Sequence, residues 1–326
     1  MTRGHADCCG HANRDAAVEP AGRFAFAPST QTIRRRWSRE LGGSFMMGSS
    51  RPARFPDDGE GPVRQVSLSE FAIACYAVSN TQFGDFVRET QYTTDAERHG
   101  WSFVFEGLLP PELQQAGLQR SSETPWWVAV PRAYWAQPEG PHSSVLQRLD
   151  HPVVHVSWND AKAYSHWSGT RLPTEAEWEF AARGGLEQAL YPWGNDLLPD
   201  GEHRCNIWQG QFPAINTIDD GYLGTAPVHT YQPNGYGLHH VVGNVWEWCE
   251  DSFSASYHAE TAPHDPQMTA PAARRALRGG SFLCHESYCD RYRVAARSSN
   301  TFDSSSSNIG FRVARSPPGA ATRKQA

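Results

Sequence analysis

Residues 151–185 read HPVVHVSWNDAKAYSHWSGTRLPTEAEWEFAARGG and carry the clearest secondary-structure signals in the chain. Thr174 and Glu177 have the spacing of a capping box, in which hydroxyl and carboxylate each satisfy an orphan backbone N–H group. Gly184 follows at the place where a helix stops. The stretch therefore predicts a helix that begins at Thr174, preceded by another around residues 160–167.

A further helix is predicted after Asn80. Phe83, Phe86 and Val87 recur there at the spacing that places side chains on one face of a helix.

Short β-rich segments lie at residues 65–68 (QVSL) and 153–156 (VVHV), and turn-forming residues occupy 56–59 (PDDG) and 233–235 (PNG). The 12 Trp, 28 Gly and 23 Pro among 326 residues favour short elements and long ordered loops held by large aromatic side chains. We therefore predict an α+β fold with low regular secondary structure.

The chain shows no change of composition that marks a linker and no repeat of fixed period. Its first 36 residues are polar and lack a period, and residues 316–326 (SPPGAATRKQA) are equally unsuited to packing. We expect a disordered N-terminal extension at 1–36, a single domain at 37–315 and a disordered tail at 316–326.

The charge balance points away from nucleic acid and membrane partners. The formal net charge is −6, and the arginine run at residues 34–36 is short and lacks interleaved aromatic residues. No stretch approaches the roughly 20 apolar residues of a membrane span, and the first residues lack the apolar run of a secretory signal. We therefore expect a cytoplasmic protein.

Seven cysteines are too few to form a disulfide scaffold in a chain of this length, and their odd number leaves at least one unpaired. We expect reduced thiols, metal ligands or catalytic thiols, and no catalytic role for Cys8 and Cys9 in the N-terminal extension. The others are Cys75, Cys205, Cys249, Cys284 and Cys289.

Cys284 and Cys289 are five residues apart, which on an ideal helix would separate their side chains by about 140°. They can converge only through a loop or a bent segment. Nearby positive charge on Arg291 and Arg293 would favour the thiolate. Two thiolates suit copper(I) better than zinc, which prefers four ligands, while a plain disulfide or two unrelated thiols remain the alternative.

Three segments carry a resemblance to a known family: residues 151–185, NGYGLHHVVGNVWEW at 234–248, and RGGSFLCHESYCDRYRVAARSSNTFDSSSSNIGFRV at 278–313. Together they resemble the formylglycine-generating enzymes, the sulfatase-modifying factor family, of bacterial type. The first two identify only the superfamily, whereas the third is similar to the catalytic segment. The resemblance, from about residue 42 to 315, implies a single compact domain that is a variant of the C-type lectin fold.

The resemblance implies an oxidoreductase that converts a cysteine of a client sulfatase to Cα-formylglycine. In this interpretation Cys284 and Cys289 bind copper(I), and the client cysteine arrives as a third sulfur ligand. Dioxygen is the acceptor and external thiols supply reducing equivalents. The client is an unfolded sulfatase segment with the motif Cys-x-Pro-x-Arg.

Ser281, Tyr288 and Trp246 match further active-site positions of the family. The resemblance implies that they shape and polarise the oxygen pocket. The ordinary alternatives are a turn residue for Ser281 and a core residue for Trp246. A peptide groove is expected to be lined by Arg291, Asn308, Trp126 and Trp127.

Family members also hold structural calcium. The resemblance places one site at the side chains of Asn206 and Asp220 with the carbonyls of Ile207 and Tyr222, oxygen ligands of the kind that calcium prefers. A second site would use the carbonyls of Gly243 and Val245 with Glu247. His240 stands there where the family commonly has Asn, and imidazole is a poor calcium ligand.

Two cysteines that form disulfides in secreted relatives are replaced by Val294 and Val313, which favours a reducing compartment. The main alternative function is a non-catalytic binding module of the same fold, and the thiol pair discriminates against it. An iron-dependent sulfoxide synthase would need an additional His-rich helical domain, for which the residues before 42 are too few and too polar.

Overall fold

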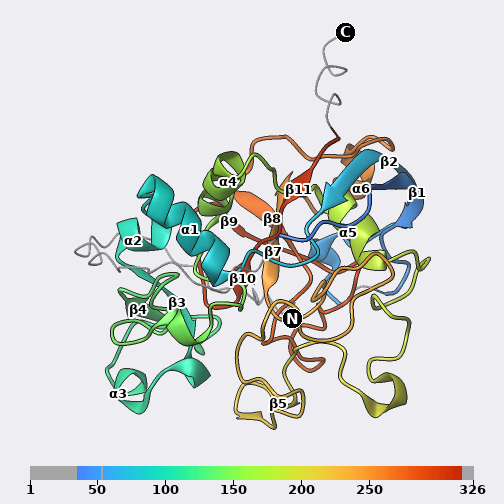
Figure 1. The fold of residues 1–326 in the computed structure, drawn as a ribbon. Helices are drawn as coiled ribbons and strands as arrows, with labels where there is room; N and C mark the ends of the chain where they lie inside the picture. Colours follow the sequence, from blue (N-terminus) through green and yellow to red (C-terminus); the bar gives the residue numbers. More distant parts are fainter. Residues whose placement is uncertain (1–34, 53, 318–326) are drawn as a thin grey trace.

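The computed structural model describes residues 35–52 and 54–317, so Cys8, Cys9 and nearly all of the predicted extension and tail lie outside the described residues. Short helices and strands are joined by long ordered loops, as predicted (Figure 1). None of the helices in the described ranges is long and apolar enough to cross a membrane.

All three predicted helices are confirmed. They are α1 (Asn80–Thr90), α4 (Trp158–Trp167) and α5 (Glu175–Arg183). A complete capping box precedes each, at Ser79, Ser157 and Thr174. Gly184 caps α5 in the left-handed conformation, as its position in the sequence indicates. The remaining helices are α2 (Asp95–His99), α3 (Pro111–Gln114) and α6 (Tyr257–Glu260).

A four-stranded sheet with the order β10-β7-β8-β9 lies at the centre of the molecule (Figure 1). The pairs β7/β8 and β8/β9 are antiparallel, whereas β10 runs parallel to β7 with Ile309 opposite Trp246. The strands are β7 (Trp246–Ser252), β8 (Arg274–Arg278), β9 (Arg297–Thr301) and β10 (Ile309–Gly310).

A second, antiparallel sheet has the strand order β1-β2-β11. Two antiparallel pairs of strands also lie in the described residues. This sheet consists of β1 (Leu41–Met47), β2 (Arg64–Ile73) and β11 (Ala314–Arg315). The first of these two-stranded pairs joins β3 (Trp101–Phe105) and β4 (Trp127–Pro131), which are separated in the sequence by α3, and the second is the hairpin of β5 (Gly210–Gln211) and β6 (Ile215–Asn216).

The strand prediction at residues 65–68 is confirmed by β2, but the one at 153–156 is wrong. Val153 N donates to Val78 O and His155 N donates to Ser306 O, so this buried segment makes single bonds to two different partners. His155 adopts a left-handed φ of 59°, which interrupts an extended strand. The predicted turn at 56–59 is a 3-10 turn that ends at Gly59.

Buried arginine–carboxylate pairs connect α5 to the central sheet. Glu175 accepts two hydrogen bonds of 2.7 Å from Arg297 in β9. Glu179 is bound by Arg183 of its own helix and by Arg278 of β8. All five side chains are almost completely buried. Because each charge has an opposite charge within hydrogen-bond distance, the cost of burying it is largely offset.

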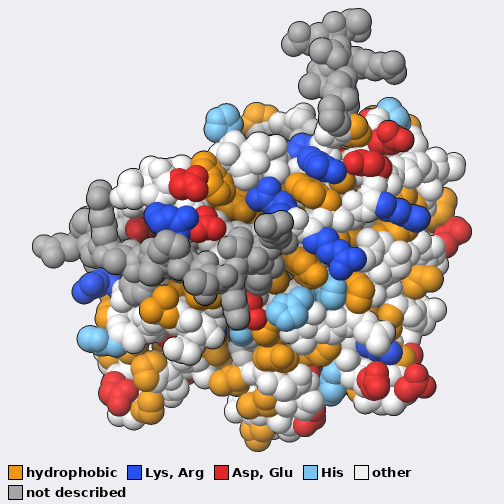
Figure 2. Space-filling view, in the orientation of Figure 1, with side chains coloured by type: hydrophobic (Ala, Val, Ile, Leu, Met, Phe, Trp, Pro, Cys, Tyr) orange, Lys and Arg blue, Asp and Glu red, His pale blue; other side chains and the backbone are white. Residues whose placement is uncertain are grey.

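The surface is of mixed character. Figure 2 shows acidic, basic and hydrophobic side chains interspersed over one face, with both signs of charge close to one another. This pattern agrees with the modest net charge of −6.

Candidate functional site

The two predicted copper ligands lie in the loop between β8 and β9, where the structure has turns and no helix, as their spacing indicates. The carbonyl of His285 accepts bonds from the backbone N–H groups of Tyr288 and Cys289, both at 3.0 Å, which bends the chain between the cysteines. Cys284 and Cys289 are each 1% exposed and belong to the same core cluster. The loop thus buries both thiols in the main hydrophobic core.

Gly280 allows the close packing at the start of this loop. It has a left-handed φ of 75°, and a Cβ at this position would lie 2.8 Å from Arg291 O and 3.2 Å from Cys284 Sγ. Any larger residue would push either the loop backbone or the first thiol out of place.

Arg291 and Arg293 follow the second thiol, but carboxylates from the other end of the chain neutralise them. Arg291 Nε donates to Asp58 at 2.6 Å, and Arg293 makes two bonds of 2.7 Å to Glu60. The predicted support for the thiolate is therefore reduced. The expectation that Arg291 and Asn308 line a peptide groove is wrong, because both side chains are buried, that of Arg291 against Asp58.

Ser281, Asn308 and Trp246 are brought together beside the first thiol. Asn308 Nδ2 donates to Ser281 Oγ at 2.9 Å, and Trp246 N donates to Asn308 O at 2.9 Å as part of the β7/β10 pairing. Ser281 N lies 3.4 Å from Cys284 Sγ, within hydrogen-bond range for sulfur. Both Ser281 and Trp246 are fully buried. Trp246 is thus a fully buried residue of the central sheet whose backbone holds Asn308 beside Ser281.

Tyr288 stands on the outer side of the thiol loop. It stacks on Phe212 with a centroid distance of 4.5 Å and meets Trp126 edge-on at 5.1 Å. Tyr288 and Trp126 are half-buried, whereas Trp127 is completely buried. The aromatic surface next to the thiol loop is thus made by Tyr288, Phe212 and Trp126, and Trp127 supports it from the core.

The backbone connects the thiol loop to the predicted calcium residues. Trp208 N donates to Cys284 O at 3.1 Å, Gly243 N donates to Gly279 O at 2.9 Å, and Asn244 N donates to Asn206 O at 2.8 Å. Three segments that are far apart in the sequence therefore fix one another at this end of the central sheet.

The first predicted calcium site has a donor set that fits a hard cation. Asp220 accepts bonds from Ile207 N at 3.1 Å and Tyr222 N at 3.0 Å, and Gln209 Nε2 contacts both Asp220 and the Ile207 carbonyl. Asn206 Oδ1 is buried and finds no hydrogen-bond partner within residues 35–52 and 54–317. Burial also raises the pKa of Asp220. A cation here would satisfy the amide oxygen and favour the ionised carboxylate.

The second predicted calcium site fits less well. Glu247 accepts bonds of 2.6 and 2.7 Å from Arg312 and a third of 2.7 Å from Trp178 Nε1. Its two oxygens are thus already engaged by a buried cation. His240 Nε2 contacts Pro227 O at 3.1 Å, and burial lowers the pKa of this imidazole to about 3. With Gly243 and Val245 as the other predicted ligands, this donor set does not fit calcium.

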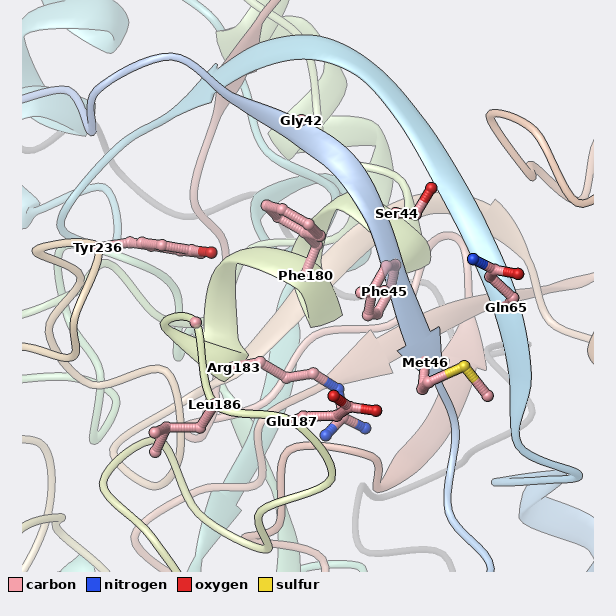
Figure 3. A pocket seen from close by; sticks show the side chains of 11 residues that line it. Gly42, Ser44, Phe45, Met46, Gln65, Phe180, Arg183, Leu186, Glu187 and Tyr236 are labelled. Carbon is pink, nitrogen blue, oxygen red and sulfur yellow. The ribbon is translucent and has the colours of Figure 1, made fainter.

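Two cavities differ in whether residues of the thiol loop line them. The larger, about 490 Å³, lies between β1 and the end of α5, with Phe45, Phe180 and Arg183 in its wall (Figure 3). None of its lining residues belongs to the thiol loop. A smaller cavity of about 200 Å³ is lined by His285 and Glu286 of that loop, together with Trp208 and Ile207. Neither Cys284 nor Cys289 is among its lining residues.

Sequence reasoning missed three residues of this region: Ser306, which bonds Asn308; Gln209, which bridges the predicted calcium ligands Asp220 and Ile207; and Asp58, which pairs with Arg291. Of these three, only Ser306 could have been suspected from the sequence, because it lies two residues before the predicted site residue Asn308. No group of three or more His, Cys, Asp or Glu side chains in the described part of the chain is arranged to hold a metal ion. The copper prediction therefore depends on the two thiols alone.

The chain resembles known proteins over most of its length. The family description "Sulfatase-modifying factor enzyme 1-like domain" matches residues 28–317. The chain is 61% identical over 294 residues to a protein of Thermomonospora curvata named formylglycine-generating enzyme, covering 89% of this chain and 96% of that protein. The chain belongs to the sulfatase-modifying factor family.

Two further proteins that resemble this chain show how activity and sequence differ among proteins of this fold. A bovine protein named "Inactive C-alpha-formylglycine-generating enzyme 2" is 48% identical over 284 residues, covering 85% of this chain and 88% of that protein. The solved structure of PvdO from Pseudomonas aeruginosa has a TM-score of 0.59 at 25% identity, over 84% of this chain and 91% of that one. The fold is therefore that of the family, while activity within the family varies.

Proposed function

We propose that this protein is a formylglycine-generating oxidase, which converts a cysteine in a Cys-x-Pro-x-Arg segment of an unfolded sulfatase to Cα-formylglycine. The observation that carries the proposal is the pair of buried thiols, Cys284 and Cys289, in one loop beside Ser281 and Trp246. The high identity to a relative with this name supports it.

Copper(I) is the proposed cofactor, and the donor set fits it. Two sulfur atoms in an apolar environment suit a soft ion of low coordination number. When bound by Cys284 and Cys289, copper supplies the one-electron chemistry that dioxygen reduction requires. In this proposal Trp246 excludes water from the site and Ser281 donates a hydrogen bond. Tyr288 presents its phenol at the outer side of the loop.

The proposed reaction balances only with an external reductant. At the client cysteine the Cβ–S bond and a Cβ–H bond break and a carbonyl forms, with release of hydrogen sulfide. One dioxygen accepts two electrons from this carbon and two from reducing thiols, which become a disulfide. One oxygen atom ends in the aldehyde and the other in water.

We also propose structural calcium at Asn206 and Asp220, because the buried Asn206 Oδ1 and the polar cluster around Asp220 suit that ion.

A reducing, cytoplasmic location is proposed as well. Cys75, Cys205 and Cys249 are free buried thiols, which supports this location. Burial raises the pKa of both Cys205 and Cys249, so these two thiols are protonated and unreactive.

The deciding experiment incubates the purified protein, reconstituted with copper, with a peptide containing Leu-Cys-Thr-Pro-Ser-Arg, oxygen and a reducing thiol. Mass spectrometry should detect conversion of the cysteine to an aldehyde. The matched controls are copper-free protein and a peptide with Ala in place of Pro. No conversion despite stoichiometric copper binding would contradict the oxidase and favour a non-catalytic binding module.

A further inference from the structure

Ser281 is held by a short relay of buried side chains that begins at Ser306. Ser306 Oγ donates to Asn308 Oδ1 at 2.7 Å, and Asn308 Nδ2 donates to Ser281 Oγ at 2.9 Å. All three residues are completely buried, so water does not compete for these bonds. With its Oδ1 bonded to Ser306, the Asn308 carboxamide faces Ser281 with its Nδ2 end.

The backbone of Asn308 is fixed independently of this relay. Trp246 N donates to Asn308 O at 2.9 Å, and Ile309 pairs with Trp246 between β10 and β7. Loss of the Ser306 hydroxyl would therefore leave Asn308 in place and free only its carboxamide to reorient. This separation makes the relay testable without disruption of the sheet.

The relay determines whether the Ser281 hydroxyl can act as a hydrogen-bond donor. A hydroxyl oxygen has two acceptor positions and one donor hydrogen. Asn308 Nδ2 at 2.9 Å and Leu283 N at 3.4 Å occupy the acceptor positions. The hydroxyl hydrogen of Ser281 can therefore be donated to a reacting group. The backbone N of the same residue lies 3.4 Å from Cys284 Sγ.

We propose that Ser306 and Asn308 are positioning residues that hold Ser281 as a hydrogen-bond donor beside Cys284. This inference rests on the proposed function. A donor fixed in advance stabilises negative charge that develops on a sulfur or oxygen atom during the reaction. Reoriented, the Asn308 carboxamide would present its oxygen to Ser281 and accept the hydrogen that the reaction needs.

The neighbouring serines provide a matched control. Ser305 is as buried as Ser306, but its hydroxyl bonds Ser102 Oγ at 2.8 Å, which in turn bonds His155 at 2.8 Å. Ser305→Ala removes the same atom from the same loop without touching the relay. A general effect of lost packing or polarity would appear in both variants.

The experiment is a double-mutant cycle on peptide conversion with Ser306→Ala, Asn308→Ala and the double variant, beside wild type and Ser305→Ala. Loss of the hydroxyl should lower kcat of Ser306→Ala about 3- to 10-fold, with KM within about 2-fold. Asn308→Ala should lower kcat about 10- to 100-fold. Because Ser306 acts through Asn308, the double variant should be no slower than Asn308→Ala.

Copper(I) affinity, measured by competition with a chromophoric chelator, is the second readout. It should stay within about 3-fold of wild type in every variant, because the thiols are unchanged, and melting temperatures should agree within about 3 °C. A double variant whose loss is the product of the two single losses would overturn the inference, as would equal losses in Ser305→Ala and Ser306→Ala. An inactive wild type would instead contradict the proposed function.

Discussion

Glu179 offers the sharpest test of how this fold is held together. Its carboxylate accepts bonds from Arg183 at 2.6 and 3.1 Å, from Gly48 N at 2.8 Å, and from Arg278. Burial alone would raise its pKa, but Arg183 and Arg278 outweigh that effect and bring the pKa down to about 2. We predict that Glu179→Gln, which keeps the shape and removes the charge, lowers the free energy of unfolding substantially.

The magnitude follows from the pKa of this group. A fall from 4.5 to about 2 corresponds to roughly 3 kcal/mol of stability at neutral pH. Removing one partner of a buried ion pair independently costs about 3–5 kcal/mol. Because the pKa is depressed on folding, the contribution is complete above about pH 4.5 and is lost as the pH falls through about 2.

The assay is urea denaturation of wild type and Glu179→Gln at several pH values. The difference in unfolding free energy should be about 3 kcal/mol near pH 7 and less than half of that near pH 3. Glu187→Gln, an exposed carboxylate just beyond the same helix, is the control and should change stability by less than about 0.5 kcal/mol. A difference that stays constant over this pH range would refute the reasoning.

Three further predictions concern the site. Cys284→Ser and Cys289→Ser should each abolish aldehyde formation in the peptide assay while the melting temperature stays within about 5 °C; turnover near that of wild type in either variant would remove the copper proposal. Calcium chelation should lower the melting temperature by about 5–10 °C, and Asp220→Asn should be insensitive to the chelator; an unchanged melting curve of the wild type would argue against this site. Glu60→Gln, which removes the bidentate partner of the buried Arg293 and leaves it only the longer pair of 3.4 Å to Asp290, should cost about 3 kcal/mol in urea denaturation, and a loss below about 1 kcal/mol would contradict the partnership with Glu60.

Local signals in the sequence predicted local structure well. The capping box at Thr174 and the apolar spacing after Asn80 identified α5 and α1, because both patterns act within a single helix. The β-rich composition of residues 153–156 was misleading, since the backbone of this segment bonds Val78 and Ser306 singly and forms no strand ladder.

The candidate site was only partly visible in the sequence. The spacing of Cys284 and Cys289 predicted a loop, and a loop is found. The charges of Arg291 and Arg293 were read as support for the thiolate because their partners, Asp58 and Glu60, lie 233 residues away in the sequence. Partners at such distances have no local pattern, so periodicity and spacing cannot reveal them.

The pairing of Asp58 with Arg291 and of Glu60 with Arg293 has a consequence for the order of folding. One side of each pair leaves the ribosome early and the other after nearly the whole domain has been synthesised. Contacts between such distant residues form late, because a long loop must close before they contribute any stability. A growing chain therefore cannot assemble the thiol loop, and its cysteines acquire their buried environment only when synthesis of the domain is almost complete.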